Sequence, residues 1–176
     1  MCCSPDSAAL AAAAGPRLDR LRAACADAGM GAFFVRDTSN IAWLTAFDGV
    51  FDDEDAHALL VTPSDAVLHT DSRYSEAAHA AAAREGAVAV DDARVAHAKL
   101  VAETFAARHA DRPSVEAEAI ALGIEDSITL AAFRALEGAL AKAPASPQLL
   151  ETSGFVRSLR AVKEPSEVAR MKAAQA

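Results

Sequence analysis

Short apolar runs of strand length alternate with helical patterns along most of the chain, and this alternation restricts the possible folds more than any other feature. Two of the runs, residues 58–61 and 66–69, flank Thr62-Pro63-Ser64-Asp65, a sequence typical of a hairpin turn. A hairpin joins antiparallel strands, whereas strands connected through helices are usually parallel. The sequence therefore predicts an α/β domain with a mixed β-sheet flanked by helices.

The other expected elements continue the alternation. Helices are predicted at residues 16–28, 72–84, 95–108, 124–136 and 149–162. Strands are predicted at residues 32–35, 87–90, 114–119 and, more weakly, 140–143. Residues 41–44 form a further short element, which Ser39 or Asn40 can cap.

The pattern divides the chain into three parts. Residues 1–15 are expected to be a flexible tail, and residues 16–162 suit one domain with a real core. Residues 163–176 are expected to be a linker and the truncated first helix of a further domain, since Pro165 and Glu167 form a helix-start signal.

The last segment carries an apolar stripe that has almost nothing left in this chain to pack against. Val168, Met171 and Ala174 share one helical face, and the helix has only about three turns. An isolated helix of that length is marginal in water. We therefore expect residues 163–176 to be frayed, or docked on a neighbouring copy.

Charge and composition exclude several classes of partner. The formal net charge is -8 and no cluster of Lys and Arg is present, which argues against nucleic acid and anionic membranes. The longest apolar run near the N-terminus, residues 8–14, is too short to span a membrane and lacks the basic start of a signal peptide. The three cysteines fit no metal-binding spacing, so we expect a cytoplasmic protein.

The residues that bear chemistry form no catalytic motif. No two of the five histidines have the spacing of neighbours on a helix, and phosphate-binding glycine loops are missing. The acidic segment 52–57, which includes Asp55 and His57, could bind a hard cation or an amine. The alternative is a solvated loop before a strand, with His57 as the first side chain of that strand.

Two further stretches are candidate sites. Trp43, the only tryptophan, lies close in sequence to Phe47 and Phe51, so it could line a pocket or an interface, or pack under the sheet. Arg73 and Tyr74 follow a predicted strand, where open α/β sheets bind ligands. In the alternative, Asp71 or Ser72 only caps the next helix and Arg73 forms a structural ion pair.

Taken in order, these stretches resemble the N-terminal domain of the creatinase, prolidase and aminopeptidase P family. The resemblance covers nearly all of the chain after residue 16. It rests on Arg17-Leu18, residues 32–35, Ser39-Asn40-Ile41-Ala42-Trp43-Leu44-Thr45, the hairpin, Thr70-Asp71-Ser72-Arg73-Tyr74, and residues 157–167 at the junction between the two domains of the family.

The resemblance implies that catalysis belongs to a second, larger domain. In family members with peptidase activity, that domain binds two divalent metals, usually manganese, cobalt or zinc, and cleaves the bond before proline. None of those ligand motifs occurs in this sequence, so the resemblance implies no catalytic residue and no metal ligand here. The implied partners are the chain's own C-terminal catalytic domain, a second copy in a homodimer, and short proline-containing peptides.

The resemblance also points to candidate residues for substrate access or for an interface: Trp43, Asp55, His57, Arg73 and Tyr74. Two alternatives stay open for the parent protein. It could be a creatinase-like amidinohydrolase, or the domain could be a peptide-binding module without catalysis.

Two positions depart from the family pattern. Ala46 stands where a glycine is common, which leaves the conformation of the following loop open, and Glu164 replaces the usual small residue that caps the last helix.

Overall fold

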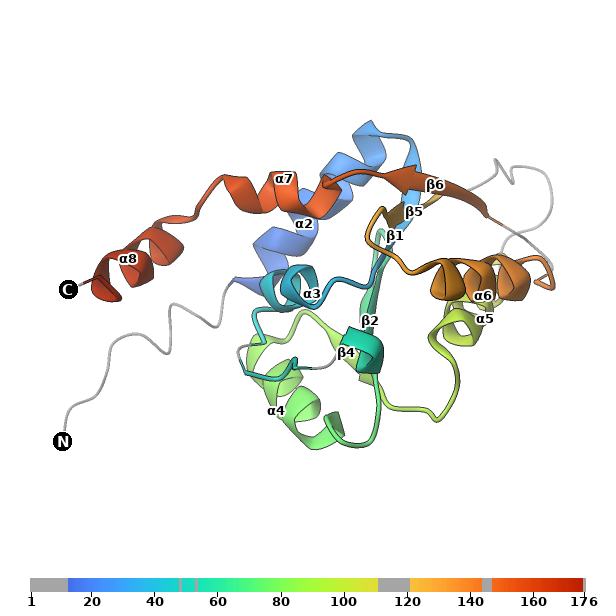
Figure 1. Cartoon of the computed structure of the whole chain (residues 1–176), viewed down its shortest axis with the longest axis horizontal. Coiled ribbons are helices and arrows are strands. Elements are labelled where there is room, and N and C mark those ends of the chain that lie inside the picture. The colour runs from blue at the N-terminus through green and yellow to red at the C-terminus, as the bar shows by residue number, and fades with distance from the viewer. Residues whose placement is uncertain (1–12, 48, 53, 111–120, 144–146, 176) are drawn as a thin grey trace.

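A mixed β-sheet forms the centre of the domain, with helices on both faces (Figure 1). The computed structural model describes residues 13–47, 49–52, 54–110, 121–143 and 147–175. In chain order the elements are α2 (Ala14–Asp27), β1 (Met30–Val35), α3 (Thr38–Thr45), the 3₁₀ turn η1 (Glu54–Ala56), β2 (His57–Val61), β3 (Ala66–Thr70), α4 (Ser75–Glu85), β4 (Ala89–Asp91), α5 (His97–Ala110), β5 (Ala121–Glu125), α6 (Leu130–Leu140), β6 (Gln148–Thr152), α7 (Phe155–Ala161) and α8 (Pro165–Ala173). The predicted fold class is confirmed.

The strand order is β4-β3-β2-β1-β5-β6. β2 pairs antiparallel with β1 and β3, as the hairpin sequence predicts, whereas the β1–β5, β3–β4 and β5–β6 pairs are parallel. Five strands of the described sheet therefore end at one edge, and β2 begins there. We call this the carboxyl edge and define it by the terminal residues Val35, Thr70, Asp91, Glu125 and Thr152, together with His57.

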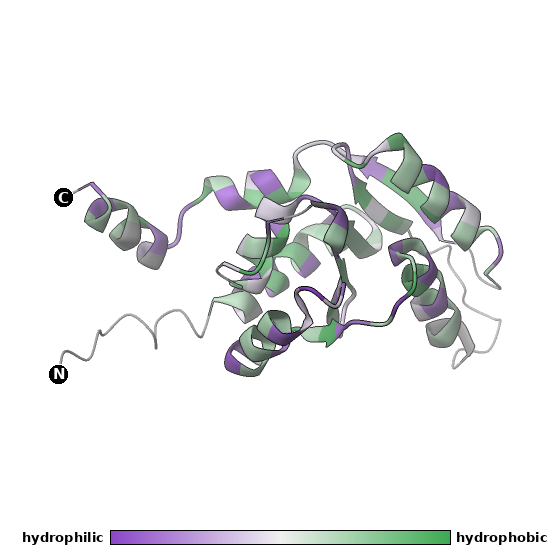
Figure 2. Cartoon of the chain, turned by 60° about the horizontal axis from the view of Figure 1, so that its bottom comes forward, coloured by the Kyte–Doolittle hydropathy of each residue, from purple (hydrophilic) through white to green (hydrophobic). Residues whose placement is uncertain are grey.

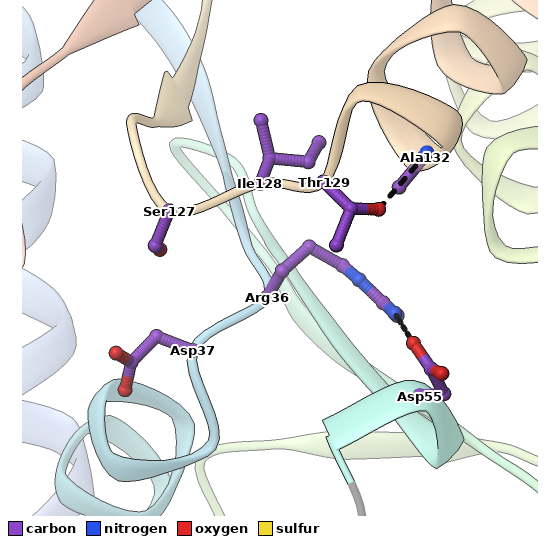
Figure 3. A pocket seen from close by; sticks show the side chains of 7 residues that line it. All are labelled: Arg36, Asp37, Asp55, Ser127, Ile128, Thr129 and Ala132. Carbon is purple, nitrogen blue, oxygen red and sulfur yellow. Dashed lines mark hydrogen bonds and ion pairs between the residues drawn. The ribbon is translucent and has the colours of Figure 1, made fainter.

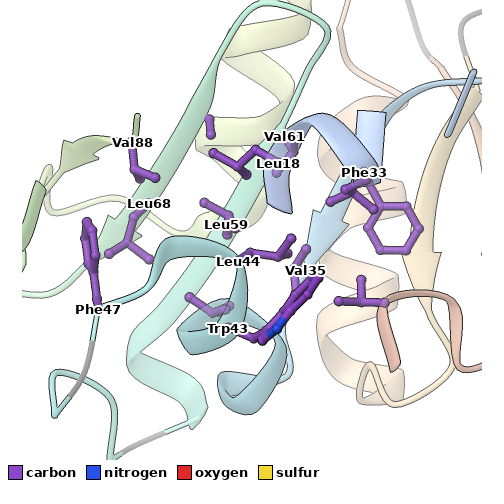
Figure 4. Close-up of a cluster of buried hydrophobic side chains, with 14 of the residues drawn as sticks. Leu18, Phe33, Val35, Trp43, Leu44, Phe47, Leu59, Val61, Leu68 and Val88 are labelled. Atoms are coloured by element: carbon purple, nitrogen blue, oxygen red, sulfur yellow. The ribbon is translucent and has the colours of Figure 1, made fainter. Parts of the chain in front are cut away.

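Two apolar clusters hold the helices to the sheet. On one face, side chains of β1, β2 and β3 such as Phe33 and Leu59 pack against α2, α3, α4 and α7 (Figure 4). On the other face, Phe34 and Ile124 pack against α5 and α6. Neighbouring residues of β1 thus point to opposite faces, as strand geometry requires. Figure 2 shows the hydrophobic residues concentrated in the strands between the two helical layers.

The second half of the sheet differs from the prediction. Residues 121–125 form strand β5, although a helix was expected from residue 124, and residues 148–152 form β6 where a helix was expected. Leu122 and Ile124 are fully buried because β5 lies between β1 and β6. The helix begins only after Thr129, whose side chain accepts a hydrogen bond from the Ala132 amide.

Two further strand predictions have different outcomes. Residue 140 closes helix α6, and residues 141–143 form a turn, so the strand expected there is wrong. The strand expected at residues 114–119 lies outside the described residues.

Two predicted helix caps are also wrong. Asp37 caps α3, with its side chain accepting a hydrogen bond from the Asn40 amide, so neither Ser39 nor Asn40 is the cap. Tyr74 precedes α4, and Asp71 instead closes a turn in which its carboxylate accepts from the Arg73 amide. Helix α3 therefore begins earlier than the sequence suggests, at Thr38, whereas α4 begins later, at Ser75.

The C-terminal segment forms a helix, which corrects the expectation that it is frayed. Figures 1 and 2 both show α8 standing away from the body of the domain. Of its apolar stripe, Val168 is 37% exposed and Met171 is 52% exposed. The expected apolar surface is therefore present, but on a formed helix. At the other terminus α2 begins at Ala14, two residues before the predicted start.

Candidate functional site

Several buried polar side chains lie at the carboxyl edge, among them His57, Thr70 and Glu125. Open α/β sheets bind ligands beyond the carboxyl ends of their strands, where connecting loops form a crevice. Four of the five candidate residues predicted from the sequence, Asp55, His57, Arg73 and Tyr74, lie at or next to this edge. Trp43 has its polar contacts elsewhere, at the start of α8.

His57 is the buried centre of the first group of side chains. Its Nδ1 lies 2.9 Å from the hydroxyl oxygen of Thr70, across the β2–β3 hairpin. The Tyr74 ring packs edge-on against the imidazole at 4.5 Å between centroids, and Phe51 does so at 4.8 Å. Because His57 is fully buried, it supports the surface rather than forming it, which fits the expected strand-start position.

Tyr74 and Arg73 form the exposed part of this group. The Tyr74 hydroxyl donates a hydrogen bond to Asp52, and the Arg73 guanidinium lies 5.2 Å from the centre of the Tyr74 ring. Arg73 also donates to Asp71, and this hydrogen bond lowers the pKa of the Asp71 carboxyl. Arg73 is thus an ion-pair partner, as one of the two interpretations held, yet its side chain is 61% exposed.

Asp55 takes part in a second group, centred on Arg36. The Arg36 guanidinium donates to the His57 carbonyl oxygen at 2.6 Å and lies 3.6 Å from the Asp55 carboxylate. These two side chains border a small cavity of about 90 Å³, whose far wall is the segment leading into α6 (Figure 3). The Asp55 side chain is 94% exposed, so it remains accessible to a ligand.

The sequence analysis missed Glu125, the buried carboxylate at the end of β5. One carboxylate oxygen accepts hydrogen bonds from the amides of Arg36 and Asp37, at 2.7 and 2.9 Å, and the other accepts from the Asn40 side chain at 2.6 Å. Asn40 in turn accepts from Arg160 at 2.7 Å. Burial raises the pKa of Glu125, against the lowering effect of the two amide hydrogen bonds.

Glu125 therefore joins three segments at the carboxyl edge: the turn after β1, helix α3 and helix α7. No sequence signal marks it, because a single glutamate after an apolar run is usually a surface residue. Asn40 was noted only as a possible cap.

Trp43 belongs to a third group, where the start of α8 joins the domain. Its indole N–H donates to Glu167 at 3.1 Å, and its carbonyl oxygen accepts from Arg17 at 2.8 Å. Arg17 also donates three hydrogen bonds of 2.9 to 3.2 Å to the Glu164 carboxylate. Arg17 and Arg20 both stack on the indole ring. Trp43 is only 7% exposed, so it is a junction residue in this conformation.

The two departures from the family pattern have local explanations. Ala46 ends α3 with φ 56° and ψ 24°, the left-handed conformation that glycine adopts without strain. Glu164 has the Arg17 guanidinium as its partner, and its amide donates to the Glu167 carboxylate at the start of α8. The larger residue at position 164 therefore binds α2 to α8.

The groups at the carboxyl edge can bind and orient charged molecules, but they do not form a metal centre. Within the described ranges, no three or more His, Cys, Asp or Glu side chains are grouped so that they could hold a metal ion. The resemblance assigns its two-metal centre to a different domain, and we derive no step through it. None of the helices in the described part of the chain has the length and apolar character that a membrane crossing requires.

Comparison with known proteins identifies the family to which this fold belongs. The family model described as the creatinase/prolidase N-terminal domain matches residues 17–162. A search of curated proteins finds no match. An Xaa-Pro aminopeptidase from Streptococcus pyogenes is 30% identical with a TM-score of 0.64, and the match covers 82% of this chain and 95% of the other.

Two further solved structures extend the comparison. The N-terminal domain of the cytoplasmic peptidase PepQ from Mycobacterium tuberculosis is 30% identical with a TM-score of 0.63, over 83% of this chain and 99% of the other. The Xaa-Pro dipeptidase from Bacillus anthracis has the same fold, with a TM-score of 0.66 at 22% identity. That match covers 89% of this chain but only 38% of the dipeptidase.

Proposed function

This chain belongs to the creatinase/prolidase N-terminal domain family, and we propose that it is the non-catalytic N-terminal domain of a metal-dependent Xaa-Pro aminopeptidase or dipeptidase. In this role it contributes to oligomer contacts and controls substrate access, while a C-terminal domain hydrolyses the Xaa-Pro bond. The observation that carries the proposal is the match over residues 17–162 to a family of N-terminal domains. In support, the fold accounts for only 38% of the dipeptidase from Bacillus anthracis.

The junction at α8 supports a partner domain within the same protein. Arg17 and Trp43 hold the first turn of α8 through Glu164 and Glu167, so the direction in which the helix leaves the domain is fixed. Beyond that turn Met171 is half exposed, and an apolar helix face is stable only when something covers it. We propose that the catalytic domain covers it.

The carboxyl edge supports the role in substrate access. Asp55 and Arg73 both expose their charged groups, and they carry opposite charges. A short peptide also carries two opposite charges, an ammonium group at one end and a carboxylate at the other. We propose that Asp55 attracts the first and Arg73 the second, with Tyr74 as an aromatic surface between them.

The remaining expectations also stand as proposals. We propose that the two divalent metals, manganese, cobalt or zinc, are bound by the catalytic domain. The protein functions as a homodimer in the cytoplasm.

The test compares the isolated chain with the parent protein that contains it. The purified 176-residue chain, supplied with Mn²⁺, Co²⁺ or Zn²⁺, should release no proline from an Xaa-Pro dipeptide, while the parent protein should do so. Metal-dependent turnover by the isolated chain would contradict the proposal. Hydrolysis of creatine instead of the peptide by the parent would favour the amidinohydrolase alternative.

Variants of the parent protein test the access role separately. Arg73→Gln should raise KM several-fold with little change in kcat, because it removes a charge that attracts substrate without touching the catalytic centre. Lys99→Gln is a matched control, since Lys99 is an exposed cation on α5. Equal KM values for the two variants would remove Arg73 from the proposed access surface.

A further inference from the structure

Two histidines that are 28 residues apart meet beside the Asp55 turn. His69 lies on β3 and is 3% exposed, and His97 is the first residue of α5. Their Nδ1 atoms are 2.6 Å apart, and the two rings are nearly perpendicular, with an interplanar angle of 86°. This separation is that of a short hydrogen bond, and it is too small for a metal ion to bridge the two nitrogens at about 2.0–2.1 Å from each.

The other ring nitrogens determine where the protons must be. His69 Nε2 lies 3.0 Å from the carbonyl oxygen of Ala93, and His97 Nε2 lies 3.0 Å from that of Asp55. A carbonyl oxygen can only accept, so both Nε2 atoms must carry a proton. In two neutral imidazoles both Nδ1 atoms would then be bare acceptors facing each other, and no hydrogen bond could join them.

We propose that His69 and His97 share one additional proton, which acts as a pH-dependent clasp on the turn that carries Asp55. With one proton between the two Nδ1 atoms, all three hydrogen bonds of the pair form at once. The pair then carries a single positive charge. When that proton is lost, at least one of the three bonds must break.

The surroundings disfavour a full positive charge on His97. His97 begins a 14-residue helix, whose N-terminal end is electropositive and disfavours a second positive charge. Burial lowers the pKa of His97 to about 4, with the nearby charges of Arg36, His57 and His69 as further causes. The charged or titratable groups that face the pair are Arg36 after β1, Asp55 in the turn η1, His57 on β2, and Asp91 on β4, which is in register with His69.

The clasp connects three segments: the end of β3, the turn that carries Asp55, and the start of α5. His69 holds the end of β3 to Ala93, and His97 holds the start of α5 to the backbone of Asp55. Protonation therefore fixes the turn that carries Asp55, the residue whose side chain we place at the substrate-access surface. As the pH rises and the shared proton leaves, the link between β3 and α5 opens and the Asp55 turn loosens. This inference needs only the geometry of the isolated chain, so it can fail while the proposed peptidase role holds.

Nitrogen-15 NMR of the histidine-labelled 176-residue chain tests the proposal directly. Between pH 8 and pH 5 the pair should take up one proton, whereas two independent imidazoles would take up two. At pH 6 the pair should show three protonated nitrogens, both Nε2 atoms and one Nδ1. Two neutral rings at pH 6, or uptake of two protons over this range, would overturn the proposal. The signals of His79, whose side chain on α4 is 54% exposed, are assigned in the same sample by comparison with His79→Gln.

Amide hydrogen exchange tests the effect on the turn. After correction for intrinsic rates, exchange at residues 55–57 should be several-fold faster at pH 9 than at pH 6, and equally fast in His97→Gln at both values. His79→Gln is the matched control and should behave as the wild type. Unchanged protection of the turn across this range would refute the clasp even if the proton is shared. If His97→Gln does not fold, the exchange rates of the wild type at pH 6 and pH 9 still test the clasp.

Discussion

Replacing Arg17 should weaken the domain more than replacing any surface cation, because Arg17 links α2 to α3 and to the start of α8 through a buried side chain. We choose Arg17→Met, which keeps the aliphatic stem and its packing but removes the guanidinium. The side chain is 4% exposed, and it donates hydrogen bonds to the Glu164 carboxylate and to the carbonyl oxygen of Trp43. The substitution leaves both acceptors without this donor.

The expected cost follows from burial. Removing one partner of a fully buried ion pair typically costs about 3–5 kcal/mol. Glu164 and Glu167 retain 22% and 13% exposure, so water can solvate them in part and the cost is lower. The Trp43 carbonyl adds about 1–3 kcal/mol if it stays unpaired. We expect a loss of about 2–4 kcal/mol in the free energy of unfolding, which for a domain of this size lowers Tm by roughly 5–15 °C.

Urea unfolding followed by circular dichroism measures the loss, and the fluorescence of Trp43 reports the junction separately. The matched control is Lys99→Met, which breaks an exposed i,i+4 pair with Glu103 and should cost less than about 0.5 kcal/mol. A double-mutant cycle with Glu164→Gln should give a coupling energy of about 1–2 kcal/mol. Losses equal to the control, or a coupling energy near zero, would refute the argument that this ion pair holds α8.

Three smaller perturbations test other parts of the structure. Gly123→Ala would place a methyl group 2.4 Å from the Met30 sulfur, so urea unfolding should show a free energy of unfolding that is lower by about 2–3 kcal/mol. The control Gly138→Ala, which has open space around it, should be stabilising. Ala46→Gly should raise the free energy of unfolding by roughly 0.5–1 kcal/mol by relieving the left-handed conformation, and a lower Tm would contradict this. The pKa of Glu125 is raised in the folded state, so its stabilising contribution is present below the ordinary value of 4.5 and is lost as the pH rises through the raised pKa. The free energy of unfolding of Glu125→Gln should lack this decline with rising pH. Parallel curves of stability against pH for the wild type and the variant would contradict the argument.

The elements that the sequence predicts well are those whose signals are local. The hairpin around Pro63 and the apolar run 32–35 appear where expected, because turn residues and burial on both faces mark them directly. The strand 121–125 was assigned in part to a helix, since Ile124 has helix-compatible neighbours and only pairing with β1 and β6 makes it a strand. A short apolar run is compatible with a strand and with a buried helix, and only the pairing with neighbouring strands distinguishes them.

Among the polar residues too, those marked by a local signal were predicted and those paired only by the fold were not. Arg73 and Tyr74 were found because they follow a strand, a local rule. Arg17 and Glu164 are 147 residues apart, and Glu125 and Asn40 are 85 residues apart, so no spacing rule can pair them. His69 and His97 were set aside for the same reason, since helical spacing detects histidines only on one helix. The fold brings such residues together, and the alternation of strands and helices predicts the class of that fold but not these pairs.

The strand order has a consequence for how this domain is made on the ribosome. β1 to β4 occupy residues 30–91 and are neighbours in the sheet, so they can pair as soon as they are synthesised. β5, the other neighbour of β1, starts only at Ala121, and translation of the intervening stretch takes on the order of seconds. During that interval the central strand of the finished sheet is an open edge, with Phe33 and Phe34 beside unpaired backbone groups. A nascent chain halted between these points should therefore be the species most prone to aggregate and to bind chaperones.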